Sequence, residues 1–311
     1  MQKKKIITLV LTMAMLISTV QVYAQDISWD NMSIAEKNKR VEKIISNTKQ
    51  NDTTVKEFTE ISSVGASKNS TATVSFTNAL DGKSEAEVKA IIKNFNAGAA
   101  NNTKTGLCTS PVTYLRNTYG KKTDNYTVVA NITLKNVAKG LTKKFSGNEN
   151  CTLVATYNIM RYYRSKGYSK IPSNNTTLYN KIMTQAKNLG YNPNNKSGLS
   201  VTKNNNLITN TWKKGFGYSS GSGSNNYFWT NSSIRSSISN GKPFIFSMAS
   251  KPYYNHSIVV YGYKVYKNNR TGKQYEFLVV SDGWSSTTRY LGPENYVGCM
   301  TSVNPPSSKT R

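Results

Sequence analysis

Two residues in this sequence are of the types that nucleophilic catalysis needs, a cysteine at an expected helix start and the single histidine of the chain. Cys151 follows Asn150, a favoured N-cap residue, and the amides and dipole of a helix start stabilise a thiolate. A backbone N–H at that position also lies near the sulfur, where an oxyanion would develop. His256 opens a run of β-forming residues, and its ordinary pKa suits proton transfer near neutral pH. The pair is predicted to be a nucleophile and its general base.

A carboxylate stands where a later hydrophobic run ends. Asp282 follows Val280-Ser281, and a carboxylate there can hold the second imidazole nitrogen and fix the ring orientation. Trp284 would cover the His–Asp pair from water. Each residue also has a plainer interpretation: Cys151 as a small buried residue, Asp282 as part of a turn, and Trp284 as core filling.

The cysteine count limits the possible disulfides and metal sites. Cys108, Cys151 and Cys299 make an odd number, so at least one thiol stays unpaired within the chain. If Cys108 pairs with Cys299, Cys151 is the free one. Three scattered cysteines and one histidine offer none of the short ligand spacings of zinc sites, so no metal and no cofactor are expected.

The elements that must position these residues follow from hydrophobic periodicity. Helices are predicted over residues 150–165, 177–189, 203–213 and 232–240, and strands over 126–134, 243–248, 257–266 and 275–281. The strand over 126–134 alternates apolar with polar residues and is expected to be half-buried. The Gly/Ser/Asn-rich stretch 217–226 is expected to be a loop. Helices first and an antiparallel meander afterwards indicate an α+β fold.

The first part of the chain has the pattern of an export signal. Residues 1–24 combine a basic start, a short apolar middle and the small-residue ending Val22-Tyr23-Ala24. The apolar run has roughly 15 residues, fewer than the ~20 that a spanning helix needs. The protein is therefore expected to be secreted, with a signal peptide at 1–24 and without a transmembrane anchor.

A polar N-terminal extension follows, over residues 25–105. Capping boxes that begin at Ser33 and Ser84 each predict a helix, and residues 71–77 could form a short strand between them. Residues 94–105 have the composition of a linker. The extension contains no candidate nucleophile or base.

Four segments, taken in order, carry a family resemblance. They are Glu149-Asn150-Cys151-Thr152, Asn240-Gly241-Lys242-Pro243-Phe244-Ile245, His256-Ser257-Ile258-Val259-Val260-Tyr261-Gly262-Tyr263 and Val280-Ser281-Asp282-Gly283-Trp284. Together they resemble the papain-like cysteine peptidases, most closely the secreted bacterial branch related to bacteriocin-processing and streptopain-type enzymes. The resemblance covers about residues 146–291, roughly half of the chain.

This resemblance implies a two-lobed fold, with the cysteine helix in a helical lobe packed against an antiparallel sheet lobe. It implies that Cys151 attacks the carbonyl of a protein or peptide substrate and forms an acyl-enzyme. It also implies that residues 25–105 are a propeptide covering the cleft and that 106–311 form the peptidase domain. The family places a glutamine shortly before the cysteine to donate into the oxyanion hole, and residues 140–150 lack one. Asn148 or Asn150 could substitute alongside the Cys151 backbone amide; Asn150 is more simply an N-cap, so Asn148 is the predicted donor.

The net charge of +26 does not by itself identify a binding partner. It would favour association with anionic cell-wall or surface polymers, and it can equally reflect a composition rich in Asn and Lys. No tight basic cluster with interleaved aromatics marks a nucleic-acid groove, so no nucleic-acid partner is expected. Two functions compete with a secreted cysteine peptidase. One is a cell-wall peptide hydrolase or another Cys–His acyl-transfer enzyme, and the other is a non-catalytic binding module on the same fold.

Overall fold

The computed structural model of the chain describes residues 28–48, 73–96 and 107–310. The expected signal peptide, 1–24, and most of the expected linker, 94–105, lie outside these residues. The helices are α2 (Ile34–Asn47), α3 (Glu85–Ile92), α4 (Pro111–Thr118), α5 (Cys151–Ser165), α6 (Asn175–Asn188), α7 (Asn204–Asn210) and α8 (Asn231–Ser239). The strands are β1 (Thr77–Asn78), β2 (Leu107–Cys108), β3 (Tyr126–Thr133), β4 (Ser222–Asn226), β5 (Phe244–Met248), β6 (His256–Asn268), β7 (Gln274–Ser281), β8 (Arg289–Leu291), β9 (Asn295–Tyr296) and β10 (Gly298–Asn304).

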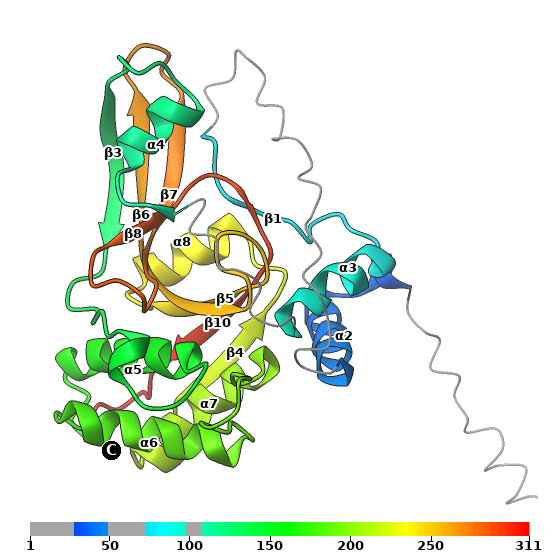
Figure 1. Cartoon of the computed structure of the whole chain (residues 1–311), viewed down its shortest axis with the longest axis vertical. Helices are drawn as coiled ribbons and strands as arrows, with labels where there is room; N and C mark the ends of the chain where they lie inside the picture. Colours follow the sequence, from blue (N-terminus) through cyan, green and yellow to red (C-terminus); the bar gives the residue numbers. More distant parts are fainter. Residues whose placement is uncertain (1–27, 49–72, 97–106, 311) are drawn as a thin grey trace, which may run out of the picture.

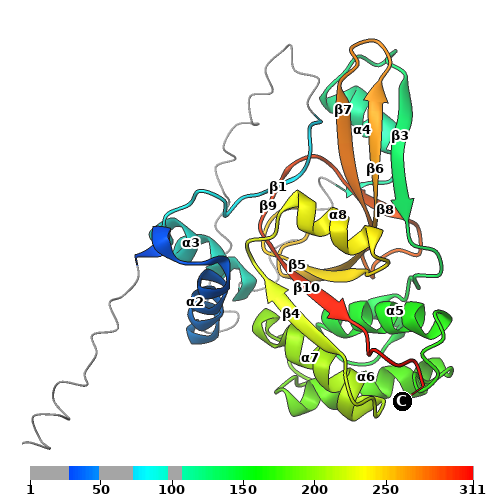
Figure 2. The same ribbon diagram turned by 180° about the vertical axis from the view of Figure 1, so that it is seen from behind.

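One antiparallel sheet organises the molecule. Its strand order is β2-β8-β7-β6-β5-β10-β4, and β3 pairs with the far half of the long strand β6. Helices α5, α6 and α7 gather at one end of the sheet, and β3, β6 and β7 extend away from them as a ribbon that carries α4 (Figure 1). The same two parts are seen from behind in Figure 2. This arrangement confirms the predicted α+β fold with a helical lobe against a sheet lobe.

The central strands bury both of their faces, as the alternation of side chains along a strand requires. Ile245 and Val259 pack into the cluster formed with α5, α6 and α7. Their neighbours Phe246 and Ile258 point the other way, into a cluster that includes Ile234 of α8. Strands β5 and β6 are therefore held between the helical lobe and α8, which places the start of β6 beside the start of α5.

Strand β3 differs from its prediction in burial. It has the expected position, but Val128 and Val129 are 46% and 48% exposed. The pairing with β6 shifts between Val128 and Ala130, so the alternation of apolar residues is interrupted by a bulge. Tyr126 and Ile132 pack, partly buried, against neighbouring clusters, but residues 127–131 between them are exposed, so the predicted half-buried face is wrong.

Strand β4 lies within the stretch predicted to be a loop. It pairs with β10, and a Cβ atom added at Gly223 would lie 2.7 Å from the Asn205 carbonyl oxygen of α7. Close packing of the strand against a helix thus requires glycine, a residue that is depleted in strands. Composition indicated a loop where tertiary packing forms a strand.

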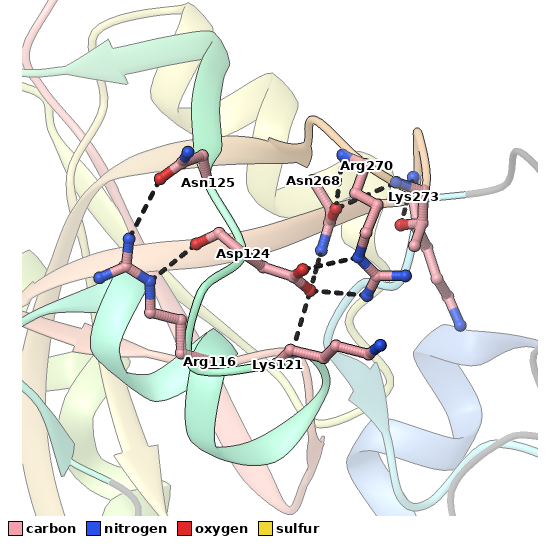
Figure 3. Close-up of polar contacts among 8 residues, drawn as sticks. Arg116, Lys121, Asp124, Asn125, Asn268, Arg270 and Lys273 are labelled. Atoms are coloured by element: carbon pink, nitrogen blue, oxygen red, sulfur yellow. Dashed lines mark hydrogen bonds and ion pairs between the residues drawn. The ribbon is translucent and has the colours of Figure 1, made fainter.

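An ion pair with a buried carboxylate and a half-exposed arginine lies at the β6–β7 turn, where the ribbon ends (Figure 3). The Asp124 carboxylate is 2% exposed and accepts from Arg270 Nε at 2.7 Å and Nη2 at 2.9 Å. Asn268 Nδ2 and the Lys121 backbone N–H donate to it at 2.9 and 3.0 Å. These donors hold the pKa of Asp124 well below its usual range, the Arg270 hydrogen bond most of all. The contacts tie the β6–β7 turn to the loop that precedes β3.

The cysteines are unpaired in this fold. Cys108, Cys151 and Cys299 are all free, and Cys108 and Cys299 belong to separate hydrophobic clusters. The pairing left open by the sequence does not form. Burial raises the pKa of Cys108 to about 11 and that of Cys299 to about 12, so both thiols are protonated and unreactive at neutral pH.

Candidate active site

Cys151 is the first residue of α5, as the sequence predicts. Asn150 precedes it but does not cap the helix with its side chain. Its buried amide instead donates to the carbonyls of Thr142 and Phe145, both at 3.2 Å, and of Ser146 at 3.3 Å. Asn150 therefore anchors the preceding loop beneath the helix start. The amides of the first turn of α5 have no intrahelical partner, so they remain available to the thiolate or to an oxyanion.

His256 begins β6 and lies beside Cys151 as a hydrogen-bond partner. Its Nε2 is 2.7 Å from the backbone carbonyl oxygen of Asp282, at the end of β7. A carbonyl can only accept, so Nε2 carries a proton and donates it. This leaves Nδ1 as the ring nitrogen that serves the sulfur, which is the tautomer a general base for Cys151 requires.

The titration of the pair is reciprocal. Burial alone would raise the pKa of the Cys151 thiol, but the hydrogen bond and charge of His256 and the backbone N–H of Ser257 outweigh it and lower that pKa. Burial alone would lower the pKa of His256, but the Cys151 hydrogen bond and charge, with the Asp282 carbonyl, outweigh it and raise that pKa. Each group therefore stabilises the charged form of the other.

The Asp282 carboxylate has partners other than the imidazole. Oδ1 accepts from the backbone N–H groups of Trp284 and Ser285 at 3.0 and 2.9 Å. Oδ2 accepts from the Tyr253 hydroxyl at 3.3 Å and lies 3.7 Å from Arg289 Nε. The expected carboxylate–imidazole bond is thus replaced by a carbonyl–imidazole bond from the same residue. The carboxylate fixes the turn after β7, and the turn presents the carbonyl.

Aromatic rings cover the imidazole. Trp284 stacks on His256 with ring centroids 4.0 Å apart and an interplanar angle of 27°. Tyr253 lies 5.5 Å from the histidine ring and 5.3 Å from the indole. The side chain predicted to cover the His–Asp pair does so, and its stacking also restricts rotation of the imidazole.

A chain of buried polar side chains joins the two lobes behind the site. Thr152 Oγ1 is 2.8 Å from Ser257 Oγ, which is 2.7 Å from Ser247 Oγ. Asn204 Nδ2 donates to Ser247 at 2.9 Å. Thr152 and Ser257 each directly follow a member of the pair, so these bonds hold the start of α5 in register with the start of β6.

A small cavity opens beside the pair. It is lined by Phe95, Glu149, Cys151, Thr152, Gly198, Leu199, Val201, Ser247, Met248, Asn255, His256 and Ser257. Its volume is ≈ 20 Å³, room for one or two water molecules at about 10–15 Å³ each. Glu149 and Asn255, on either side, adopt positive φ angles of 47° and 49°, a strained conformation for residues with a side chain that is often found at functional sites.

Two lining residues lacked a local signal in the sequence. Glu149 and Asn255 flank the predicted pair, but a positive φ leaves no sequence pattern unless the residue is glycine. Phe95, a third lining residue, lies in a 3₁₀ turn, Lys93–Asn96, at the start of the stretch predicted to be a linker.

Asn148, the predicted oxyanion donor, points elsewhere. Its side chain is exposed and donates to the Asn194 carbonyl at 3.4 Å, and it does not contribute to the cavity lining. The backbone amide of Cys151, at the open start of α5, is the donor that the geometry favours.

Within residues 28–48, 73–96 and 107–310, no group of three or more His, Cys, Asp and Glu side chains could hold a metal ion. In the same described ranges, no helix has the length and hydropathy to cross a membrane.

A comparison with known proteins bears on this geometry. The family model described as Peptidase_C39 like family matches residues 141–292. The match is consistent with the resemblance to the papain-like cysteine peptidases. It spans α5 through β8 and includes the cysteine, the histidine and the aspartate described above. No curated protein and no solved structure matches the chain. The family supports a cysteine-peptidase type of function for the C39-like domain.

Proposed function

We propose that this chain is a secreted cysteine endopeptidase in which Cys151 is the nucleophile and His256 the general base. The observation that carries the proposal is the hydrogen-bonded Cys151–His256 pair at the edge of a cavity, in which the two pKa values move in opposite directions. A structural cysteine in an apolar site has a raised pKa, as Cys108 and Cys299 do. Cys151 departs from that behaviour because of its partner, which is the arrangement of an activated thiol.

In the proposed reaction, the Cys151 thiolate attacks the carbonyl carbon of a peptide bond. The negative charge that develops on the carbonyl oxygen lies near the amides at the start of α5. The His256 imidazolium gives its Nδ1 proton to the departing amine, leaving a thioester on Cys151. Neutral His256 then takes a proton from water, whose oxygen attacks the thioester and releases the carboxylic acid and the thiolate.

In this proposal Asp282 orients the base through its backbone carbonyl. The carbonyl accepts from Nε2 of His256 and so keeps the imidazole in the required tautomer, and Trp284 stacks on the ring and restricts its rotation. This arrangement needs no metal ion, because nucleophile, base and oxyanion donor all come from the protein.

The experiment is to express residues 25–311 as wild type and as Cys151→Ala, and to incubate both with denatured casein. Cleavage by the wild type alone supports the proposal. A parallel incubation with peptidoglycan distinguishes a cell-wall peptide hydrolase. If neither protein cleaves either substrate, and iodoacetamide modifies Cys151 no faster than Cys108 and Cys299, the catalytic proposal is refuted and a binding module is favoured.

Secretion and association with anionic polymers belong to the same proposal. The signal pattern of residues 1–24 supports export, and the net charge of +26 supports binding to acidic cell-wall or surface polymers. Recovery of the protein from culture medium with Gln25 at its start would test export, and its release from cell walls by salt would test the electrostatic association.

A further inference from the structure

The N-terminal extension is built into the sheet lobe. Val74 forms two backbone hydrogen bonds with β7, both at 2.9 Å. The Val74 N–H donates to the Gln274 carbonyl, and the Glu276 N–H donates to the Val74 carbonyl. Strand β1 pairs in parallel with β9. Buried Asn78 donates through Nδ2 to the carbonyls of Tyr227 and Trp229, at 2.9 and 3.1 Å.

The extension also completes hydrophobic clusters of the domain. Phe76 is buried against Trp229, with ring centroids 6.3 Å apart, in the cluster that contains α8 and β5. A second cluster joins the extension to the domain. The extension contributes Trp29, Val41, Ile45, Leu80, Val88, Ile91, Ile92 and Phe95, and the domain contributes Val201, Tyr227, Phe228, Ala249, Val297 and Cys299. Loss of the extension would expose these domain residues as a contiguous apolar patch.

A buried carboxylate of the domain accepts a hydrogen bond from the extension. Glu276 is fully buried, and Arg235 binds it with two hydrogen bonds at 2.7 and 2.8 Å. Asn231 Nδ2 and Ser75 Oγ donate to Oε2 at 2.8 and 2.9 Å. Ser75 therefore satisfies part of a charge that belongs to the domain, and its departure would leave the carboxylate with one donor fewer.

Phe95 connects this interface to the candidate active site. It is 3% exposed, meets Tyr227 edge to face at a centroid distance of 5.6 Å, and lines the cavity with Cys151 and His256. Asn96 holds the turn in place by donating to the Ile45 carbonyl of α2 at 2.7 Å. The ring is thus part of a packed wall, and the cavity stays open beside it.

We propose that residues 73–96, with α2 packed on them, remain on the domain as a permanent wall of the cleft, and that Phe95 limits the size of the substrate side chain next to Cys151. The size limit rests on the proposed peptidase function, whereas the permanence of the wall does not. A propeptide removed on activation, as the family resemblance implies, would have to take Phe76 and Ser75 out of the domain interior.

Retention is tested by inserting a recognition sequence for a site-specific protease between Asn96 and Leu107 of the 25–311 protein. After cleavage, the N-terminal fragment is expected to co-elute with the domain on native gel filtration and to separate only in denaturant. Separation under native conditions, with or without a gain of activity, would overturn the proposal.

The size limit is tested with Phe95→Ala on peptides that differ in the residue on either side of the scissile bond. The ratio of kcat/KM for leucine over alanine at one of these positions is expected to rise about tenfold or more, as a pocket enlarged by several methylene volumes allows. Phe76→Ala is the matched control, because it removes an equally buried phenylalanine of the extension that does not line the cavity. Its ratio should equal that of the wild type.

An unchanged ratio in Phe95→Ala, or an equal rise in Phe76→Ala, would overturn the size limit. If the wild type cleaves no peptide, the proposed peptidase function fails, and co-elution of the fragment still decides whether the wall is permanent.

Discussion

Two polar pairs lie in different parts of this molecule, and each has one buried member. One is the Asp124–Arg270 pair at the end of the ribbon (Figure 3). The other is the Cys151–His256 pair, where α5 meets β6. Both contain shifted pKa values, and in both a hydrogen-bonded partner opposes the cost of burial. They differ in what surrounds them.

The Asp124 carboxylate is fully engaged by Arg270, Asn268 and the Lys121 backbone. The Cys151 sulfur lines a cavity, and strained backbone flanks it at Glu149 and Asn255. A shifted pKa alone therefore does not identify a catalytic group in this protein. What distinguishes the second pair is an open side where a reacting atom can enter.

The largest effect should follow from His256→Ala. Loss of the base should lower kcat/KM about 10³- to 10⁴-fold, because the mutant lacks both proton transfer and the partner that stabilises the thiolate. Burial then dominates and the pKa of Cys151 rises. The measurement is peptide hydrolysis together with the rate of Cys151 alkylation as a function of pH.

The pH dependence has a definite sign. The Cys151 pKa is lowered from 9.0, so in the wild type the thiolate and its alkylation persist to lower pH than in an ordinary cysteine. The His256 pKa is raised from 6.5, so the imidazolium persists to higher pH than in an ordinary histidine. Activity should be bell-shaped between these limits. If the pH dependence of Cys151 alkylation were the same in His256→Ala as in the wild type, His256 would not activate the thiol, and the contrast with the Asp124–Arg270 pair would fail.

Asp282→Ala should have an intermediate effect. The backbone carbonyl that holds the imidazole survives the substitution, while the turn loses the carboxylate that accepts from Trp284, Ser285 and Tyr253. We expect kcat/KM to fall by about 100-fold or less, well short of the ~10⁴-fold that follows when a carboxylate itself holds the imidazole. Steady-state kinetics decide the matter. A loss as large as that of His256→Ala would assign the orienting role to the carboxylate.

Asp124→Asn should have the smallest effect on activity. The substitution weakens the bidentate contact with Arg270 and loosens the end of the ribbon, so Tm should fall by about 5 °C. The kcat/KM measured at a temperature where the variant is fully folded should stay within about twofold of the wild type, since the ribbon end lies away from the cavity. Thermal unfolding followed by circular dichroism, with kinetics on the same preparation, tests both. A large kinetic loss in a fully folded variant would mean that the two assemblies are coupled.

The sequence by itself determined the local features of the site. A cysteine at a helix start, a histidine at a strand start and a carboxylate at a strand end are read from nearest neighbours, and the helices and central strands follow from periodicity. These predictions needed no knowledge of which segments meet. The family match over 141–292 is consistent with the same residues.

Tertiary structure decided everything that depends on contacts between distant segments. It selected the carbonyl of Asp282 over its carboxylate, because the backbone N–H groups of Trp284 and Ser285 already donate to the carboxylate. It turned Asn148 away and brought Phe95 to the cavity from about 55 positions earlier in the chain than Cys151. Periodicity reports whether a residue is buried, whereas the identity of its neighbour depends on how the chain packs, and that is why only the folded structure could place these groups.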